Sequence, residues 1–226
     1  MIYAISDLHG CYDLYLKMLE KIKFGDNDTL YILGDIVDRG EDGIKILLDA
    51  MKRRNVIVIQ GNHDYMAYRI LKNLTANDGG SDNISDMMQM WFFDGGNTTH
   101  DAFMELDDND QRKILSYMNT FLIYDEVTVN SNTFFMSHTV PEKARMLEFE
   151  NLLPLEFIVG EPDYDMQYYD DKYIITGHTP TAFIEPGYSG KIWKKNNHIA
   201  IDCGAVFVKK LGCICLDTLE EFYVEG

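Results

Sequence analysis

The sequence is short of basic side chains and has no long apolar run, and each shortage excludes a class of protein. Only 20 Lys and Arg residues stand against 37 Asp and Glu residues, so the formal net charge is −17. A chain with no basic surplus is poorly suited to binding nucleic-acid phosphates or anionic membrane surfaces. No apolar run approaches the roughly 18 residues that a membrane-spanning helix requires. We therefore expect neither a nucleic acid nor a membrane as a partner.

Cysteine and proline are also scarce. Four cysteines in 226 residues are too few for a scaffold held by disulfides. The first residues, MIYAISDLHG, lack the basic segment and long apolar core of a secretion signal, and we interpret residues 2–6 as a first strand. We therefore expect reduced cysteines and a cytoplasmic location.

The rest of the composition is that of an ordinary folded protein, with 46% hydrophobic and 12% aromatic residues. A chain of this length buries roughly 70% of the surface that it exposes when unfolded. No linker rich in Pro, Gly or Ser interrupts the sequence. We therefore predict a single domain over residues 1–226.

Short apolar runs alternate with helical periodicity in the first third of the chain. The apolar runs are residues 2–6, 29–33 and 56–60, and the periodic segments between them are 12–23 and 43–53. This order predicts a β-α-β-α-β unit with parallel strands and right-handed crossovers.

A polar residue follows each of these predicted strands. Asp7 and Asp35 are 28 positions apart, and Asp35 and Asn62 are 27 apart. Ligands of open α/β sheets bind beyond the carboxyl ends of the strands, so we expect the three side chains at one place.

The middle of the chain, roughly 64–118, is predicted to be helical, and the last third to hold short strands in antiparallel or mixed pairing. The Met-rich and aromatic segment 83–93 has two interpretations, a lid over the site or a buried amphipathic helix. Segment 147–169 is predicted to be a surface loop with at most a short helix. The strands predicted in the last third are 121–129, 133–137, 173–176, 198–202, 212–216 and 221–224.

Polar motifs made of metal-ligand residues follow the apolar runs. Asp, Asn and His suit borderline and hard divalent cations, and the absence of cysteine among them argues against a structural zinc cluster. Burying so many ionisable groups together would be costly without a cation, so jointly the motifs predict a metal site. The motifs are DLHG (7–10), GDIVDRG (34–40), GNHD (61–64) and GHTP (177–180), and His138 follows the run 133–137.

These motifs resemble those of the calcineurin-like metallophosphoesterases, and more narrowly the bacterial and phage PPP-type serine/threonine phosphatases. The pattern of that family is GDxHG, GDxVDRG, GNHE and two later histidines. Segment 34–40 matches in full, and IDCGA at 201–205 resembles a late strand of the family. The resemblance implies an α/β fold, an αββα sandwich of mixed sheets with an N-terminal βαβαβ unit.

The resemblance also implies a site for two divalent metal ions that activate a water molecule. Manganese is the expected metal, with Fe, Zn, Co and Ni as alternatives. Asp35 would bridge the two ions, which is possible because a carboxylate has two oxygens. One ion would be held by Asp7, His9 and Asp35, and the other by Asp35, Asn62, His138 and His178.

Three further residues would carry the catalysis that the resemblance implies. His63 would be the general acid that protonates the leaving group, and Asp38 would orient it. Arg39 would bind phosphate oxygens through its forked guanidinium. Asn62 and His63 would also contact the substrate phosphate.

The sequence departs from the family pattern where the substrate is expected to bind. Gln60 stands where an arginine usually precedes GNH, and Asp64 stands in place of the usual Glu. Arg145 is a candidate for the second phosphate-binding arginine, although it also reads as a solvated charge beside Glu142 and Glu148. These differences concern the substrate and leave the expected metal ligands unchanged.

The leading hypothesis is hydrolysis of phosphate monoesters by a serine/threonine-type protein phosphatase. Its partner would be a phosphorylated protein or peptide, or a small phosphoester, with basic flanking residues favoured by the acidic chain. A dinucleoside polyphosphate hydrolase acting on diadenosine tetraphosphate is the first alternative. A catalytically silent metal-binding scaffold is the second, and the retention of His63, Asp38 and Arg39 argues against it because a scaffold needs no proton donor.

Overall fold

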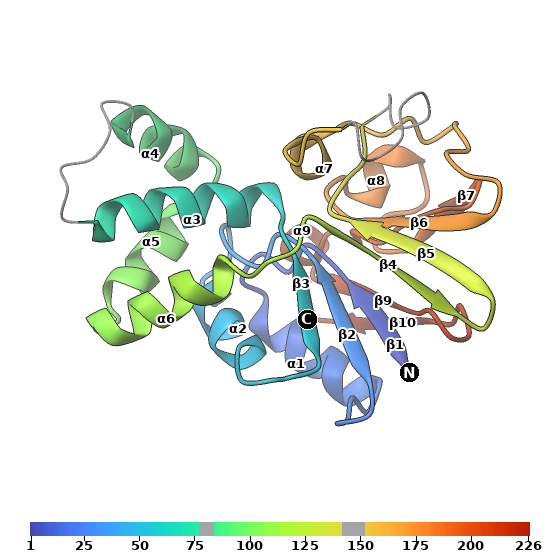
Figure 1. Ribbon diagram of the computed structural model, residues 1–226, viewed down its shortest axis with the longest axis horizontal. Helices are drawn as coiled ribbons and strands as arrows, with labels where there is room; N and C mark the ends of the chain where they lie inside the picture. The colour runs from blue at the N-terminus through green and yellow to red at the C-terminus, as the bar shows by residue number, and fades with distance from the viewer. Residues whose placement is uncertain (77–83, 142–151) are drawn as a thin grey trace.

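The computed structural model of the protein describes residues 1–76, 84–141 and 152–226. In this part of the chain two five-stranded β-sheets lie face to face, and most of the helices cover the first sheet (Figure 1). The strand order is β10-β9-β1-β2-β3 in the first sheet and β4-β5-β6-β8-β7 in the second. The predicted αββα sandwich of mixed sheets is confirmed.

The predicted βαβαβ unit forms the middle of the first sheet. Strands β1 (Ile2–Ile5), β2 (Thr29–Leu33) and β3 (Val56–Ile59) pair in parallel. Helices α1 (Tyr12–Lys21) and α2 (Gly43–Ala50) connect them. All three strand ends therefore point to the same edge of the sheet.

The C-terminal segment completes the first sheet with two antiparallel strands. Strand β9 (Lys210–Cys215) pairs with β1, and β10 (Glu221–Glu225) pairs with β9. Cys213 and Cys215 alternate along β9 and face the core on the same side of the strand. All four cysteines are free thiols.

The second sheet is mixed. Strand β4 (Tyr124–Val129) is antiparallel to β5 (Asn132–Ser137), whereas β5, β6 (Lys172–Thr176) and β8 (His198–Ala200) are parallel. Strand β7 (Trp193–Lys195) pairs antiparallel with β8 and was not predicted.

One predicted strand began too early. Segment 121–129 was expected to be extended throughout, but β4 begins at Tyr124. Leu122 instead forms an isolated parallel bridge with Ile59 of the first sheet. This bridge is a tertiary contact, so the local pattern could not place it.

The helical middle of the chain packs beside the first sheet (Figure 1). It consists of α3 (Asn62–Thr75), α4 (Ile84–Phe93), α5 (Asn97–Met104) and α6 (Asp108–Met118). Helix α6 begins where the carboxylate of Asp107 accepts hydrogen bonds from two backbone N–H groups of its first turn. No helix in the described part of the chain is both long and apolar enough to cross a bilayer.

The first sheet is apolar on both faces because it lies between helices and the second sheet. Along β1, Tyr3 and Ile5 face the helices and Ala4 faces the second sheet. Burial on both faces explains why its strands read as continuous apolar runs.

A smaller core covers the outer face of the second sheet. Phe135 and Ile174 pack there against Phe157 of the short helix α7 (Glu156–Val159). Segment 147–169 was predicted to be a loop with at most a short helix, and its described part fits that prediction, while residues 147–151 lie outside the described residues.

Candidate metal and phosphate site

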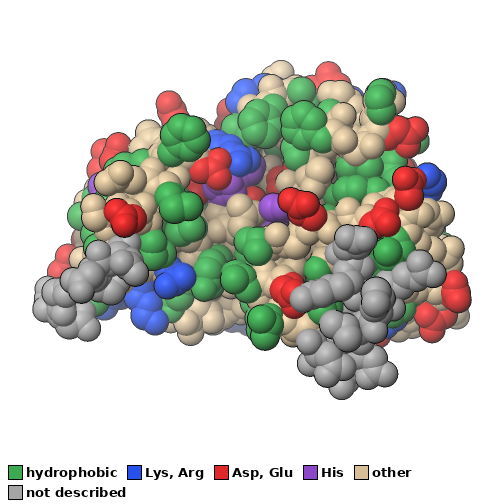
Figure 2. Space-filling view, turned by 90° about the horizontal axis from the view of Figure 1, so that it is seen from above, with side chains coloured by type: hydrophobic (Ala, Val, Ile, Leu, Met, Phe, Trp, Pro, Cys, Tyr) green, Lys and Arg blue, Asp and Glu red, His purple; other side chains and the backbone are tan. Residues whose placement is uncertain are grey.

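The predicted polar residues meet at one edge of the two sheets. Asp7, Asp35 and Asn62 lie just beyond β1, β2 and β3, and His138 and His178 lie just beyond β5 and β6. Histidine side chains reach the surface in the centre of this face, beside acidic and basic side chains (Figure 2). The edge where parallel strands end is where α/β sheets bind ligands.

The backbone at this edge is strained at four of the candidate metal ligands. Asp7, His9, Asp35 and His178 have φ values of 52°, 40°, 54° and 69°, a left-handed region that non-glycine residues rarely adopt. Gly34 has φ 86°, and a Cβ atom there would lie 2.6 Å from Nδ1 of His138. Strain concentrated in this way is typical of functional sites, where packing holds the side chains in fixed directions.

The first cluster of possible ligand atoms contains His9, Asp35 and His63, with one atom of each within 4.8 Å of the others. Nδ1 of His9 donates to the carbonyl oxygen of Val37 over 3.0 Å, so Nε2 faces the site. That atom lies 3.7 Å from Oδ2 of Asp35. The other carboxylate oxygen, Oδ1, accepts the backbone N–H of His63, which fixes the orientation of Asp35.

The second cluster contains Asp35, His138 and His178. Oδ1 of Asn62 lies 3.0 Å from Nε2 of His138 and 3.0 Å from Nδ1 of His178. Nε2 of His138 is also 3.5 Å from Oδ2 of Asp35. Asp35 belongs to both clusters, as expected for a ligand shared between two cations.

The hydrogen bonds of His138 show that this cluster suits a cation. Nδ1 of His138 donates to the carbonyl oxygen of Leu33 over 2.7 Å, and burial lowers the pKa of the ring well below its usual value. The neutral ring therefore presents the lone pair of Nε2 to the amide oxygen of Asn62 and the carboxylate of Asp35. A positive ion between these acceptors would remove their mutual repulsion.

Asp7 lies next to the second cluster. Both of its carboxylate oxygens accept the backbone N–H of His178, at 3.1 and 3.0 Å. Burial, followed by the neighbouring carboxylates of Asp202 and Asp35, raises the pKa of Asp7 well above its usual value. Asp7 is not among the residues whose ligand atoms lie within 4.8 Å of one another in either cluster.

The electrostatics of the whole set fit divalent cations. Burial raises the pKa of Asp35 and lowers those of His9 and His178, the last to about 4. Neutral imidazole is the form that binds metals, and a cation offsets the cost of burying ionised carboxylates. Carboxylate, imidazole and amide donors together suit hard or borderline divalent metals.

His63 and Asp38 form a buried pair beside the first cluster. Nδ1 of His63 donates to Oδ2 of Asp38 over 2.8 Å. Nε2 of His63 is buried and has no hydrogen-bond partner. It lies 3.4 Å from Oδ2 of Asp94, close enough for charge attraction although outside hydrogen-bond geometry. The ring is held from one side and presents a free nitrogen to the site on the other.

Arg39 projects its guanidinium across the same region. Nη1 donates to Nε2 of His9 over 2.7 Å, and Nη2 donates to Oδ1 of Asp94 over 3.1 Å. The guanidinium carbon lies 5.4 Å from the centre of the Phe207 ring, a cation–π contact. Phe207 belongs to α9 (Ala205–Val208), which begins at the last residue of segment 201–205. That segment was expected to resemble a late strand of the family, but the neighbouring strand β8 ends at Ala200.

Two residues from the helical middle hold Asp38, and the sequence analysis did not assign them to the site. The indole nitrogen Nε1 of Trp91 donates to Oδ2 of Asp38 over 2.8 Å. The hydroxyl of Thr99 donates to Oδ1 over 2.7 Å. The only sequence signal for these contacts was that segment 83–93 ends in aromatic residues, next to the turn 94–96.

Helix α4, the described part of segment 83–93, therefore has one packed face and one exposed face. Trp91 is buried against the site, whereas Met90 and Phe93 are 66% and 96% exposed. The described part of the segment forms α4 and fits the interpretation of a packed helix at Trp91.

Asp64 has a structural role that was not predicted from the sequence. Its carboxylate accepts the backbone N–H groups of Asp35, Ile36 and Gly61 at 2.8, 3.0 and 3.1 Å. It therefore joins the loops that follow β2 and β3. Burial raises its pKa to about 6.

The remaining candidates lie away from the chemistry or outside the described residues. Gln60 is buried and its backbone N–H donates to the carbonyl of Leu122. Arg145 lies outside the described residues, so its predicted contact with phosphate stays a prediction. His198 is buried beside Thr176, and His100 pairs with Asp101, so both have partners outside the two clusters.

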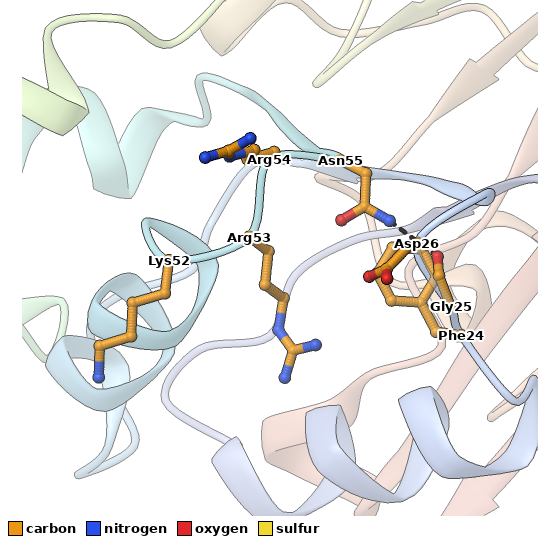
Figure 3. Close-up of a pocket in the computed structure, with 7 residues that line it drawn as sticks. All are labelled: Phe24, Gly25, Asp26, Lys52, Arg53, Arg54 and Asn55. Carbon is orange, nitrogen blue, oxygen red and sulfur yellow. Dashed lines mark hydrogen bonds between the residues drawn. The ribbon is translucent and has the colours of Figure 1, made fainter.

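A cavity of about 500 Å³ at the opposite edge of the first sheet does not form a second anion site (Figure 3). The side chain of Arg53 is paired with Asp49, and those of Lys52 and Arg54 point apart. The basic run 52–54 therefore does not converge on one ligand.

The site and fold agree with one family model, which matches residues 1–182 and describes calcineurin-like phosphoesterases. The chain belongs to this family. Its members use divalent metals, and the two clusters around Asp35 are the residues that could hold them.

Relatives with named activities match shorter segments of the chain. Symmetrical bis(5'-nucleosyl)-tetraphosphatase from Wigglesworthia glossinidia brevipalpis is 38% identical over 81 residues, which is 34% of this chain and 30% of the relative. The protein of the same name from Buchnera aphidicola (strain 5A) is 49% identical over 65 residues, 27% of this chain and 23% of the relative. The chain thus matches less than a third of the length of these relatives.

Two solved structures share the fold. A protein described as a candidate diadenosine tetraphosphatase has a TM-score of 0.70 at 14% identity, covering 100% of this chain and 93% of its own. A serine/threonine phosphatase from Saccharomyces cerevisiae has a TM-score of 0.60 at 12% identity, covering 100% and 79%. At these identities the likeness shows the fold alone.

Proposed function

We propose that the protein hydrolyses phosphate monoesters, and that its substrate is a phosphorylated serine or threonine side chain of a protein or peptide. The observation that carries this proposal is the buried Nε2 of His63, which has no hydrogen-bond partner and faces the same carboxylate, that of Asp94, as the guanidinium of Arg39. A proton donor and a phosphate ligand side by side are what cleavage of an ester with a poor leaving group requires.

The metal ligands of the proposed site are those that the sequence predicts. Asp7, His9 and Asp35 are proposed to hold one cation, and manganese is the proposed metal. The second is proposed to be held by Asp35, Asn62, His138 and His178. When bound, two such cations supply a water of lowered pKa and positive charge near the phosphoryl oxygens.

The protein side chains supply binding and proton transfer. The two terminal nitrogens of Arg39 can bind two phosphate oxygens at once. His63 donates the proton on Nε2 to the leaving alkoxide oxygen, while its Nδ1–H stays bonded to Asp38. The Asp38 carboxylate compensates the charge of the doubly protonated ring, and Trp91 and Thr99 hold that carboxylate in place.

The surroundings of Arg39 favour a substrate with few negative charges of its own. A cavity of about 460 Å³ begins at Arg39 and is lined by Asp13, Glu41 and Asp42 together with Lys209. Asp42 is paired with Lys45, whereas no salt bridge among the described residues engages Asp13 or Glu41. These two carboxylates suit a basic residue beside the phosphorylated side chain.

Hydrolysis of a dinucleoside tetraphosphate is the second candidate. The relatives that match parts of the chain are named for that activity, which is the observation in its favour. A tetraphosphate chain carries several negative charges, and beyond the proposed metal site it would meet the carboxylates of Asp13 and Glu41.

The experiment is an activity panel on the manganese-loaded protein. Its substrates are a phosphoserine peptide with basic flanks, the same peptide with acidic flanks, p-nitrophenyl phosphate, its bis-ester and diadenosine tetraphosphate. We expect hydrolysis of the monoesters and the highest kcat/KM for the basic peptide.

The control for this panel is Asp35→Asn protein purified in the same way, which detects a contaminating phosphatase. Hydrolysis of diadenosine tetraphosphate alone would replace the first candidate with the second. No hydrolysis of any substrate would favour a metal-binding scaffold.

A further inference from the structure

The carboxylate of Asp94 lies where the phosphate of a substrate is expected. Oδ1 accepts from Nη2 of Arg39 over 3.1 Å, and Oδ2 lies 3.4 Å from Nε2 of His63. These two nitrogens belong to the residues proposed to bind the phosphate and to protonate its leaving group. The two oxygens of one carboxylate thus face the two groups that would face two oxygens of a phosphate ester.

The backbone that carries Asp94 is held firmly. Asp94 and Gly95 form the turn between α4 and α5, and the carbonyl oxygen of Gly95 accepts the backbone N–H of Arg39 over 2.9 Å. Gly95 has φ 94°, and a Cβ atom there would lie 2.9 Å from Cγ of Arg39. The turn is therefore tied to Arg39 and needs a glycine to lie so close.

The side chain of Asp94, in contrast, is free to leave. It is 56% exposed, whereas that of its partner Arg39 is 28% exposed and that of His63 only 3%. Its rotation about the Cα–Cβ bond would release both contacts without moving the turn. Arg39 would keep its backbone bond to Gly95 and its contact with Phe207.

We infer that Asp94 is a specificity-determining residue that competes with the substrate phosphate for Arg39 and His63. In the free protein its carboxylate occupies the anion position, and a substrate must displace it. The displaced charge stays at the mouth of the site, where it repels further negative charges on the substrate. Asp94 thereby favours esters with a single phosphate or a cationic neighbour over polyphosphate chains. The inference rests on the proposed function only in identifying the competing anion as substrate phosphate.

Asp94 could instead be needed to position Arg39, and the test must separate the two roles. Asp94→Asn keeps the shape and an oxygen that can accept from Arg39, but removes the negative charge. If Asp94 competes with phosphate, removing its charge lets phosphate bind more tightly and lowers KM, while kcat does not change. If Asp94 instead positions Arg39, the same change weakens phosphate binding and lowers kcat.

The experiment uses inorganic phosphate as the probe, with manganese-loaded protein and isothermal titration calorimetry. We expect phosphate to bind the Asp94→Asn protein about fivefold more tightly, which is the factor that an exposed ion pair corresponds to. The difference in phosphate affinity between the variant and the wild type should shrink at high salt, because salt screens exposed charges. In kinetics, KM should fall more for diadenosine tetraphosphate than for p-nitrophenyl phosphate.

The matched control is Asp86→Asn, which makes the same change of charge on the exposed first turn of α4. Equal tightening in both variants would mean that net charge alone is responsible and would overturn the inference. So would unchanged or weaker phosphate binding in Asp94→Asn, or a fall in kcat at constant KM.

The two proposals fail separately. If none of the five substrates is hydrolysed but phosphate binds Asp94→Asn more tightly, the proposed function is wrong and the competition stands. If monoesters are hydrolysed but phosphate binding does not change in the variant, the competition is wrong and the proposed function stands.

Discussion

Nδ1 of His63 lies 2.8 Å from Oδ2 of Asp38, and both side chains are buried. The pair joins the segment after β2 to the first turn of α3. The same oxygen of Asp38 accepts the indole N–H of Trp91 from α4. The direction of the His63 ring is thus set by three separate parts of the chain, which makes its function sensitive to changes outside the metal clusters.

Replacing His63 tests its part in proton transfer. We expect His63→Asn to retain metal and to lower kcat by about 10²- to 10⁴-fold, the usual contribution of a general acid. The loss should be greatest for phosphoserine peptides and smallest for aryl phosphates, whose leaving groups need no proton. The loss of kcat is measured by steady-state kinetics on substrates with a series of leaving groups. His198→Gln is the control for loss of a buried histidine. Unchanged turnover on the phosphoserine peptide would rule out the role.

Trp91→Phe tests whether α4 acts on the site through Asp38. The change removes a donor to a buried carboxylate, so stability should fall by about 1–3 kcal/mol in urea denaturation. We expect kcat to fall with little change in KM, because the orientation of His63 is disturbed more than phosphate binding. Trp193→Phe is the matched control, since its indole donates to Glu185 away from the site. Similar kcat values for the two variants would contradict this prediction.

Asp35→Asn should separate metal binding from folding. We expect both metals and all activity to be lost, as measured by elemental analysis and by turnover. In the presence of a chelator, however, the variant should be at least as stable as the wild type at pH 7. Burial raises the pKa of Asp35, so its ionised form is destabilising without a cation, and an amide oxygen can still accept the N–H of His63. A clear loss of stability in the metal-free variant would refute this account.

His198 should give a pH dependence of stability that lies away from the metal ligands. Burial lowers its pKa from 6.5 to about 4, so the unfolded chain binds more protons than the folded one between these values. Its stabilising contribution is complete above about pH 6.5 and is lost as the pH falls toward 4. Between pH 7 and pH 5 the loss is about 2 kcal/mol.

The measurement for His198 is urea denaturation of the metal-free wild type and of His198→Gln at both pH values. Other titrating groups cancel in the difference between the two proteins. We expect the wild type to lose about 2 kcal/mol more than the variant on going from pH 7 to pH 5. Equal losses would show that His198 is not buried in its neutral form.

Much of the site could be predicted because it depends on local patterns. Asp7, Asp35 and Asn62 each follow a short apolar run, and crossover helices force the strands to be parallel, so their ends must meet. His138 follows another such run, and His178 was placed by its own short motif. The structure brings all five side chains to one edge of the sheets.

The contacts that the sequence analysis missed all cross between distant segments. Trp91, Thr99 and Asp94 lie on helices or turns whose apolar periodicity predicts a helix but not the neighbour against which it packs. Asp64 could be read as a conservative change from Glu, but its three backbone hydrogen bonds exist only when the loops after β2 and β3 lie side by side. Strand β7 has only three residues, too few for a period to appear.

The sequence by itself determined the βαβαβ unit, the polar residues at the strand ends and the neighbourhood of His63, because these follow from periodicity and from the spacing of short motifs. Only the tertiary structure decided what holds Asp38 and what lies in front of Arg39. Those contacts depend on how the helical middle packs against the sheet edge, and packing selects neighbours by shape and buried hydrogen bonds, which leave no repeating pattern along the chain.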